Sequence, residues 1–104
     1  DSDDGDDGDN QPAYELSQNY PNPWRDSTTI RFRIPERSAV VIEVFDVSGR
    51  RVETLVQESS MEAGVHQMQW NASRLSGGVY ICRMVVTEVS GARYMQSRQM
   101  TLVK

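Results

Sequence analysis

The chain has 104 residues and only one cysteine, Cys82, so it forms no internal disulfide and must take its stability from an apolar core. Its longest uninterrupted apolar run, residues 39–42, is far shorter than the roughly 18 residues that a membrane-spanning helix needs. It has one histidine, His66, and its metal-ligating residue types lack zinc-site spacing. No Ser-His-Asp or Cys-His order and no glycine-rich loop ahead of a helix is present. The sequence therefore predicts no cofactor, no metal, no membrane span and no enzymatic activity.

A block of basic residues is also absent, and the net charge of −4 conceals an uneven distribution. Residues 1–10 contain six aspartates and no basic residue, whereas residues 11–104 contain nine acidic and eleven basic residues, a balance of +2. A nearly neutral body is not suited to nucleic-acid phosphates, so no nucleic-acid partner is expected. Residues 1–13 have no apolar residue before Pro12, which predicts an acidic disordered linker. Residues 14–104 then form one domain.

The aspartates of this linker raise the alternative of calcium binding, because their spacing resembles an EF-hand loop. Such a loop requires D-x-[DN]-x-[DN]-G and a glutamate at its twelfth position. A loop that starts at Asp1 has Gly5 and Pro12 at its fifth and twelfth positions. A loop that starts at Asp4 has Gly8 at its fifth position. Neither register fits, so a plain spacer is favoured and loose calcium binding stays the alternative.

From Leu16 onward, apolar residues recur at every second position, which is typical of half-buried strands. The alternating sets are Ile30/Phe32/Ile34, Val40/Ile42/Val44, His66/Met68/Trp70, Tyr80/Cys82/Met84 and Met100/Leu102. Residues 51–58 are ambiguous, because their apolar residues also fit one turn of helix. Proline, glycine and serine separate the runs at the spacing of a sandwich. The pattern predicts an all-β, immunoglobulin-like antiparallel β-sandwich of about seven strands with no significant helix.

Within this sandwich, Tyr20-Pro21-Asn22-Pro23 is expected to form a stiff non-helical corner, since each proline fixes φ and removes a backbone donor. Tyr20 or Trp24 would then cover one end of the core, and a recognition surface is the alternative role. Gly49 is expected to take a positive φ in a tight turn capped by Asp46.

Two further side chains have only structural roles in this reading. His66 is expected to be a strand residue packed beside Trp70. Cys82 is expected to be a buried, inert thiol.

Five elements in a fixed order resemble the C-terminal sorting domain of cargo of the type IX secretion system, over about residues 16–104. They are Tyr20-Pro21-Asn22-Pro23, residues 28–35, Asp46-Val47-Ser48-Gly49-Arg50-Arg51-Val52, Leu75-Ser76-Gly77-Gly78-Val79-Tyr80 and Met100-Thr101-Leu102-Val103-Lys104. The positions that match the family's motifs are Pro21, Asn22, Pro23, Asp46, Gly49, Arg50, Val52, Leu75, Gly78, Tyr80, Arg98, Met100, Leu102 and Lys104. The resemblance also favours a strand over residues 51–58.

The resemblance implies a non-catalytic secretion signal that directs a larger secreted protein across the outer membrane of a Bacteroidota-type cell. The implied partners are the fused N-terminal cargo, type IX translocon components and a surface sortase-type protease. That protease usually removes such a domain and attaches the cargo to the surface, and the cut is expected within residues 1–15. The domain would pass through the periplasm to the cell surface or the extracellular space. The chain starts without an initiator Met, so we expect it to be the end of a longer protein.

The last strand has two compatible roles. As an edge strand with free backbone groups, it would suit β-augmentation by a partner, and in the family the last strand and its basic end belong to the signal. Alternatively, Met100 and Leu102 belong to the core and Lys104 is a solvated end.

Three other functions compete with the sorting signal. A hook-capping-type immunoglobulin-like domain has similar strands, but typically a longer turn before its G-x-Y element. A carbohydrate-binding module of an extracellular glycosidase needs a flat row of exposed aromatic residues, whereas Tyr14, Trp24 and Tyr94 are scattered along the sequence. A plain spacer module needs no particular C-terminal residues.

Overall fold

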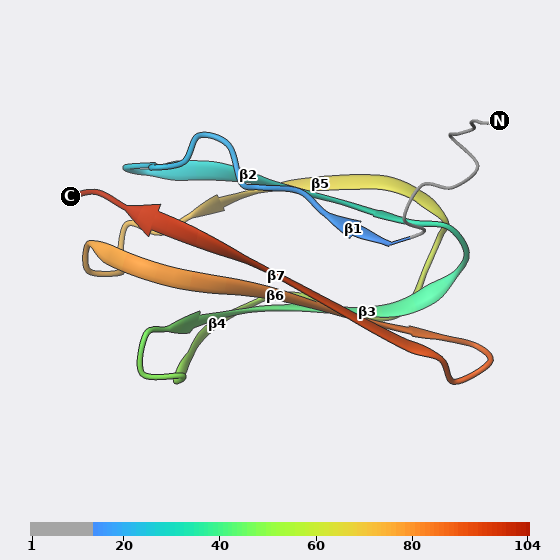
Figure 1. The fold of residues 1–104 in the computed structure, drawn as a ribbon. Coiled ribbons are helices and arrows are strands. Elements are labelled where there is room, and N and C mark those ends of the chain that lie inside the picture. The colour runs from blue at the N-terminus through green and yellow to red at the C-terminus, as the bar shows by residue number, and fades with distance from the viewer. Residues whose placement is uncertain (1–13) are drawn as a thin grey trace, which may run out of the picture.

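The computed structural model describes residues 14–104, which form seven strands and no helix (Figure 1). The strands are β1 (Glu15–Leu16), β2 (Ser27–Ile34), β3 (Ser38–Asp46), β4 (Arg51–Met61), β5 (Gly64–Asn71), β6 (Gly78–Glu88) and β7 (Arg93–Leu102). The all-β prediction is confirmed, and the ambiguous residues 51–58 belong to β4. The acidic linker and the loose calcium binding expected at residues 1–13 lie outside the described residues. Within residues 14–104, no helix is long and apolar enough to cross a membrane.

The seven strands form two antiparallel sheets that lie as two layers (Figure 1). One sheet has the order β1-β2-β5, and the other has the order β4-β3-β6-β7. The chain passes between the sheets after β2, after β4 and after β5, which makes the domain a β-sandwich.

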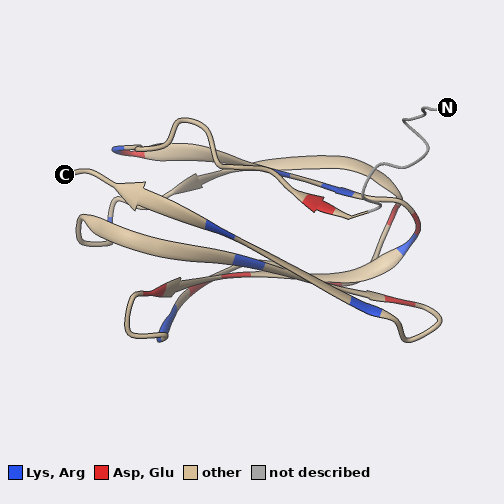
Figure 2. Cartoon of the chain, in the orientation of Figure 1, with Lys and Arg blue, Asp and Glu red and all other residues tan. Residues whose placement is uncertain are grey.

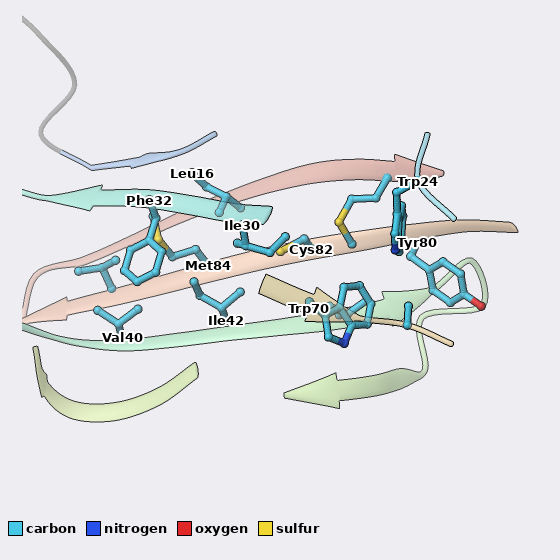
Figure 3. Packing of buried hydrophobic residues seen from close by; sticks show 14 of the residues in the cluster. Leu16, Trp24, Ile30, Phe32, Val40, Ile42, Trp70, Tyr80, Cys82 and Met84 are labelled. Carbon is cyan, nitrogen blue, oxygen red and sulfur yellow. The ribbon is translucent and has the colours of Figure 1, made fainter. Parts of the chain in front are cut away.

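The core lies between the two layers and consists of the alternating residues of both sheets (Figure 3). In β3, for example, Val40, Ile42 and Val44 are fully buried, while the residues between them are partly exposed on the outer face. Successive side chains of a strand point to opposite faces, so period two in the sequence becomes one inward face. Each fully buried aliphatic side chain of this size contributes about 1.5–3 kcal/mol.

β4 lies at the edge of its sheet and contributes less to the core than β3 or β6. Its register against β3 shifts at three places, and its side chains are at most partly buried. Val52, Leu55 and Val56 pack against the core from this edge. The bulged pairing explains why these residues do not show a clean alternation in the sequence.

Two side chains differ from the sequence-based expectation in their neighbours. His66 is a strand residue, but its ring stacks on Phe32, with ring centroids 5.3 Å apart, and not beside Trp70. The register of β2 and β5 causes this, because it pairs Phe32 directly with His66. Of the two candidates for covering the end of the core, Trp24 is 1% exposed and Tyr20 is 79% exposed, so the tryptophan has that role.

Candidate functional site

Most of the predicted motif positions gather at one end of the sandwich, which we call the motif end. It consists of residues 21–24, 46–50, 72–80 and 102–104. In Figure 1, the start of β2, the β3–β4 turn, the start of β6 and the C-terminus lie at this end, whereas β1 begins at the other. Segments from the beginning, the middle and the end of the described chain therefore lie at one end of the sandwich.

Hydrogen bonds fasten the C-terminal segment to the proline corner. The Trp24 amide donates to the Thr101 carbonyl at 3.0 Å, and the Val103 amide donates to the Trp24 carbonyl at 2.8 Å. The Asn22 side chain adds a third bond, because its Oδ1 accepts from the Thr101 amide at 2.9 Å. The corner is therefore non-helical, as predicted, and it holds the end of β7 in place.

The turn between β3 and β4 is organised by Asp46. Its Oδ1 accepts hydrogen bonds from the Ser48 hydroxyl at 2.6 Å and from the amides of Ser48 and Arg50, each at 3.0 Å. The Ser48 hydroxyl and then the Arg50 amide lower the pKa of the Asp46 carboxyl below its ordinary value of 3.8. Gly49 has φ +90°, as the turn requires. Asp46 is therefore the capping residue that the sequence predicted, and it leaves Arg50 exposed.

The loop before β6 forms the third part of the motif end. Tyr80 is 7% exposed, and its hydroxyl donates to the Ser76 carbonyl at 2.6 Å. This hydrogen bond links the loop to the start of β6, which follows it. Leu75 is half-buried against the core. The Lys104 Nζ donates to the Ser73 carbonyl at 2.9 Å, which joins this loop to the C-terminus.

The motif positions divide into buried anchors and exposed residues. Tyr80, Met100 and Leu102 are buried in the core, and Val52 packs against it. The exposed positions of the motif end are Pro21, Asn22, Pro23, Gly49, Arg50, Gly78 and Lys104. The anchors fix the backbone, and the exposed residues offer the surface that a partner can contact.

Arg98 lies apart from the motif end and has a different role. Its Nε donates to the Leu16 carbonyl at 2.8 Å, which ties β7 to β1 across the gap between the sheets. Gln96 makes two similar bonds, from its Nε2 to the Tyr14 carbonyl and from the Leu16 amide to its Oε1, both at 2.7 Å.

The last strand was expected to have free backbone groups along its edge, and hydrogen bonds occupy part of that edge in β7. The Gln99 carbonyl accepts from the Gln18 side chain at 2.8 Å, and the outward groups of Thr101 and Val103 bind residues 22–24. The C-terminal half of this edge is therefore already hydrogen-bonded, because the chain itself returns along it. A partner strand could pair there only by displacing residues 18–24.

Residues 14–104 contain no group of three or more His, Cys, Asp or Glu side chains that could hold a metal ion. Burial raises the pKa of the Cys82 thiol to about 12, so it is protonated at neutral pH. Charged residues of both signs are spread over both sheets (Figure 2). Trp24, Trp70 and Tyr14 are buried, so they present no flat aromatic row.

The contacts that hold the N-terminal segment leave no clear signal in the sequence. Tyr14 stacks on Tyr94 with ring centroids 4.0 Å apart, and its hydroxyl donates to Glu88. Gln96 was also missed, because a glutamine in a strand gives no sequence signal of its partner. The two tyrosines could have been noticed only by assuming that the first and last strands are neighbours.

The sequence model of the secretion system C-terminal sorting domain matches residues 18–93 of this chain. The match ends at the first residue of β7 and does not include Arg98 to Lys104. A comparison with curated protein sequences finds no match.

Solved structures give similar folds. The chain is similar to a part of dimeric latent PorU from Porphyromonas gingivalis, with 27% identity and a TM-score of 0.66, over 86% of this chain. That match spans only 9% of the PorU chain. CopC from Methylosinus trichosporium OB3b has 16% identity and a TM-score of 0.57, over 86% of this chain and 92% of CopC. An engineered protein has 21% identity and a TM-score of 0.61, over 90% of this chain and 20% of its own. The last two are similar in fold alone.

Proposed function

This chain belongs to the secretion system C-terminal sorting domain family, and on that basis we propose that the motif end is the surface that the type IX translocon recognises. Domains of this family are non-catalytic type IX sorting signals. The chain therefore carries an address for export to the cell surface or the extracellular space, and it is fused to an N-terminal cargo.

One observation carries the proposal: motif residues from four separate segments lie together at the end of the sandwich opposite Tyr14. Tyr14, ahead of which the cargo is joined, therefore lies away from the motif end. The residues that a partner can reach there, such as Arg50 and Lys104, are exposed on a frame of buried anchors. A rigid frame with exposed polar and charged residues is what a recognition surface needs.

The route and the fate of the domain are also proposals. The folded unit, residues 14–104, forms in the periplasm and is bound there by the translocon. A sortase-type protease at the surface then removes the domain or uses it to attach the cargo, by cutting within residues 1–15. Burial of Tyr14 supports a cut ahead of it, because a protease needs an accessible, extended substrate backbone.

A reporter fusion tests the export function. Residues 1–104 are fused to the C-terminus of a periplasmic reporter and expressed in a type IX-competent host and in a translocon-deficient strain. We expect the reporter at the cell surface only in the competent host. A reporter that stays in the periplasm of the competent host would contradict the function.

A paired substitution tests the motif end. Arg50→Ala with Lys104→Ala should lower surface delivery by about tenfold, which is the loss expected for one interface anchor. The control is Arg31→Ala with Arg33→Ala, two exposed arginines of β2 outside the motif end. Equal delivery by both pairs, with unchanged unfolding midpoints, would place recognition elsewhere on the domain.

A further inference from the structure

The outer face of the four-stranded sheet is apolar where a sandwich usually exposes polar residues to water. In β3 and β6, the residues that point away from the core include Val41, Phe45, Val79, Ile81 and Val85. They pair across the two strands, Val41 with Val85 and Phe45 with Ile81, and form a strip that the ion pair of Glu43 and Arg83 interrupts between these two pairs. Strands that are apolar on both faces are typical of sheets covered on both faces. Within residues 14–104, no second layer covers this strip.

The strip opens into a groove at its end. The groove has a volume of about 500 Å³, and Phe45, Val79 and Ile81 line it together with Arg83, Ser97 and Gln99. That volume lies in the range of sites that take a ligand or a few side chains of a partner. Asp46 and Gly49 also line it, so the groove is continuous with the motif end. We call it the outer groove.

The charge of the outer groove is set by Arg83. Its guanidinium carbon lies 4.5 Å from the centre of the Phe45 ring. Its Nη2 donates to Glu43 Oε1 at 3.2 Å, but Glu43 also binds the Arg51 Nη1 at 3.1 Å. Two arginines therefore share one carboxylate, which leaves a net charge of +1. The Arg83 Nε is buried and has no hydrogen-bond partner among the described residues, whereas the Arg83 side chain as a whole is 39% exposed.

Asp46, the carboxylate that lines the groove, does not offset this charge. Asp46 is already paired with Arg50, whose Nε lies 3.3 Å from its Oδ2. The outer groove therefore offers apolar walls, the side chains of Ser97 and Gln99, and the exposed part of the Arg83 side chain. A carboxylate flanked by apolar side chains is complementary to this combination.

Two other occupants fit the outer groove less well. If a second copy of the chain bound this face, Arg51 and Arg83 of the two copies would lie close together, and like charges repel. The acidic segment of residues 1–11 supplies carboxylates but contains no apolar residue that could cover Phe45 or Ile81. Charge and hydrophobicity together favour a separate protein.

We propose that the outer groove docks a protein segment of the type IX export machinery that presents an Asp or Glu side chain between apolar side chains. This inference rests on the proposed function and adds the chemistry of the partner to it. The carboxylate binds Arg83, and the apolar side chains cover the strip of β3 and β6. Burial of this strip would explain why these two strands are apolar on both faces.

The test measures the affinity of the fluorescently labelled chain, residues 1–104, for detergent-solubilised type IX translocon by fluorescence anisotropy. Ile81→Thr removes apolar surface from the groove and keeps a β-branched strand residue. Arg83→Glu combined with Glu43→Arg keeps an ion pair between β3 and β6 and the local net charge, but it replaces the guanidinium that lines the groove with a carboxylate. The matched control is Arg31→Glu, which reverses a charge on the outer face of the other sheet.

We expect both groove variants to bind at least tenfold more weakly, with the Arg31→Glu chain close to wild type and all urea midpoints similar. Unchanged affinity of both groove variants would overturn the inference. So would a wild-type dimer in analytical ultracentrifugation that the groove variants abolish, because the occupant would then be a second copy. If the wild-type chain exports the reporter and the groove variants export it equally, only this inference fails. If the wild-type chain does not export it, the proposed function fails.

Discussion

At the scale of single residues, Tyr80 shows how one side chain serves both the core and a loop of the motif end. Its ring lies in the core, and its hydroxyl holds the Ser76 carbonyl. Tyr80→Ala should lower the free energy of unfolding by about 3–5 kcal/mol, because it leaves a cavity. Tyr80→Phe should cost about 1 kcal/mol, the net value of one hydrogen bond. Urea titration followed by tryptophan fluorescence measures both, and equal midpoints for Tyr80→Ala and wild type would contradict the burial.

Asp46 makes the β3–β4 turn sensitive to acid. Folding lowers its carboxyl pKa, so the carboxylate stabilises the folded state above the ordinary value of 3.8 and loses this effect as the pH falls through the lowered value. Asp46→Asn cannot titrate and should lack this component. The difference between the urea midpoints of wild type and Asp46→Asn should therefore be constant from neutral pH to about 3.8 and should shrink as the pH falls further, through the lowered pKa. A difference that stays constant below pH 3.8 as well would show that ionised Asp46 does not support the turn.

Residue identities predicted burial better than they predicted neighbours. The alternation of Val40, Ile42 and Val44 was sufficient to assign them to the core, because a strand has only two faces. The ring partner of His66 could not be predicted in this way. It depends on the register between β2 and β5, two strands that residues 35–63 separate in the sequence. The exposure of Tyr20 and the burial of Trp24 likewise depend on where the proline corner meets β7.

At the scale of elements, β3 and β6 contained a signal that the sequence analysis did not use. Their nearly continuous apolar runs indicate burial on both faces, whereas only the inward set was assigned. The resemblance predicted the individual motif residues. That most of them lie together at one end of the sandwich follows only from the order and direction of the strands. The contribution of Arg98 to β1 was not predictable, because an arginine in an edge strand gives no sign of which carbonyl it binds.

The two-residue strand β1 depends on side chains of β7. Gln96→Ala with Arg98→Ala removes the bonds to both backbone groups of Leu16 and one bond to Tyr14. The Leu16 amide should then exchange with solvent about tenfold faster, which corresponds to about 1.4 kcal/mol, a value within the range for one hydrogen bond. Hydrogen exchange followed by NMR measures this. Arg93→Ala, an exposed position of the same strand, is the control, and equal exchange in the two variants would show that β2 alone holds β1.

At the scale of the whole molecule, Cys82 reports on the cooperativity of the sandwich. It is 1% exposed between the sheets, and burial raises its thiol pKa to about 12. Because the folded pKa is raised, this burial favours the folded state fully below the ordinary value of 9.0, and the effect is lost as the pH rises from 9.0 towards 12.

A disulfide-exchange reagent at pH 8 should therefore react with Cys82 only when the sheets separate. Its rate should be negligible in buffer and should rise with urea in parallel with the unfolded fraction measured by tryptophan fluorescence. Cys82→Ala with Ser97→Cys moves the thiol to an exposed position of β7, and that variant should react at once without urea. Rapid labelling of Cys82 in the folded wild type would mean that the sheets open locally around β6. A rate that follows global unfolding would instead show that one cooperative core supports the motif end.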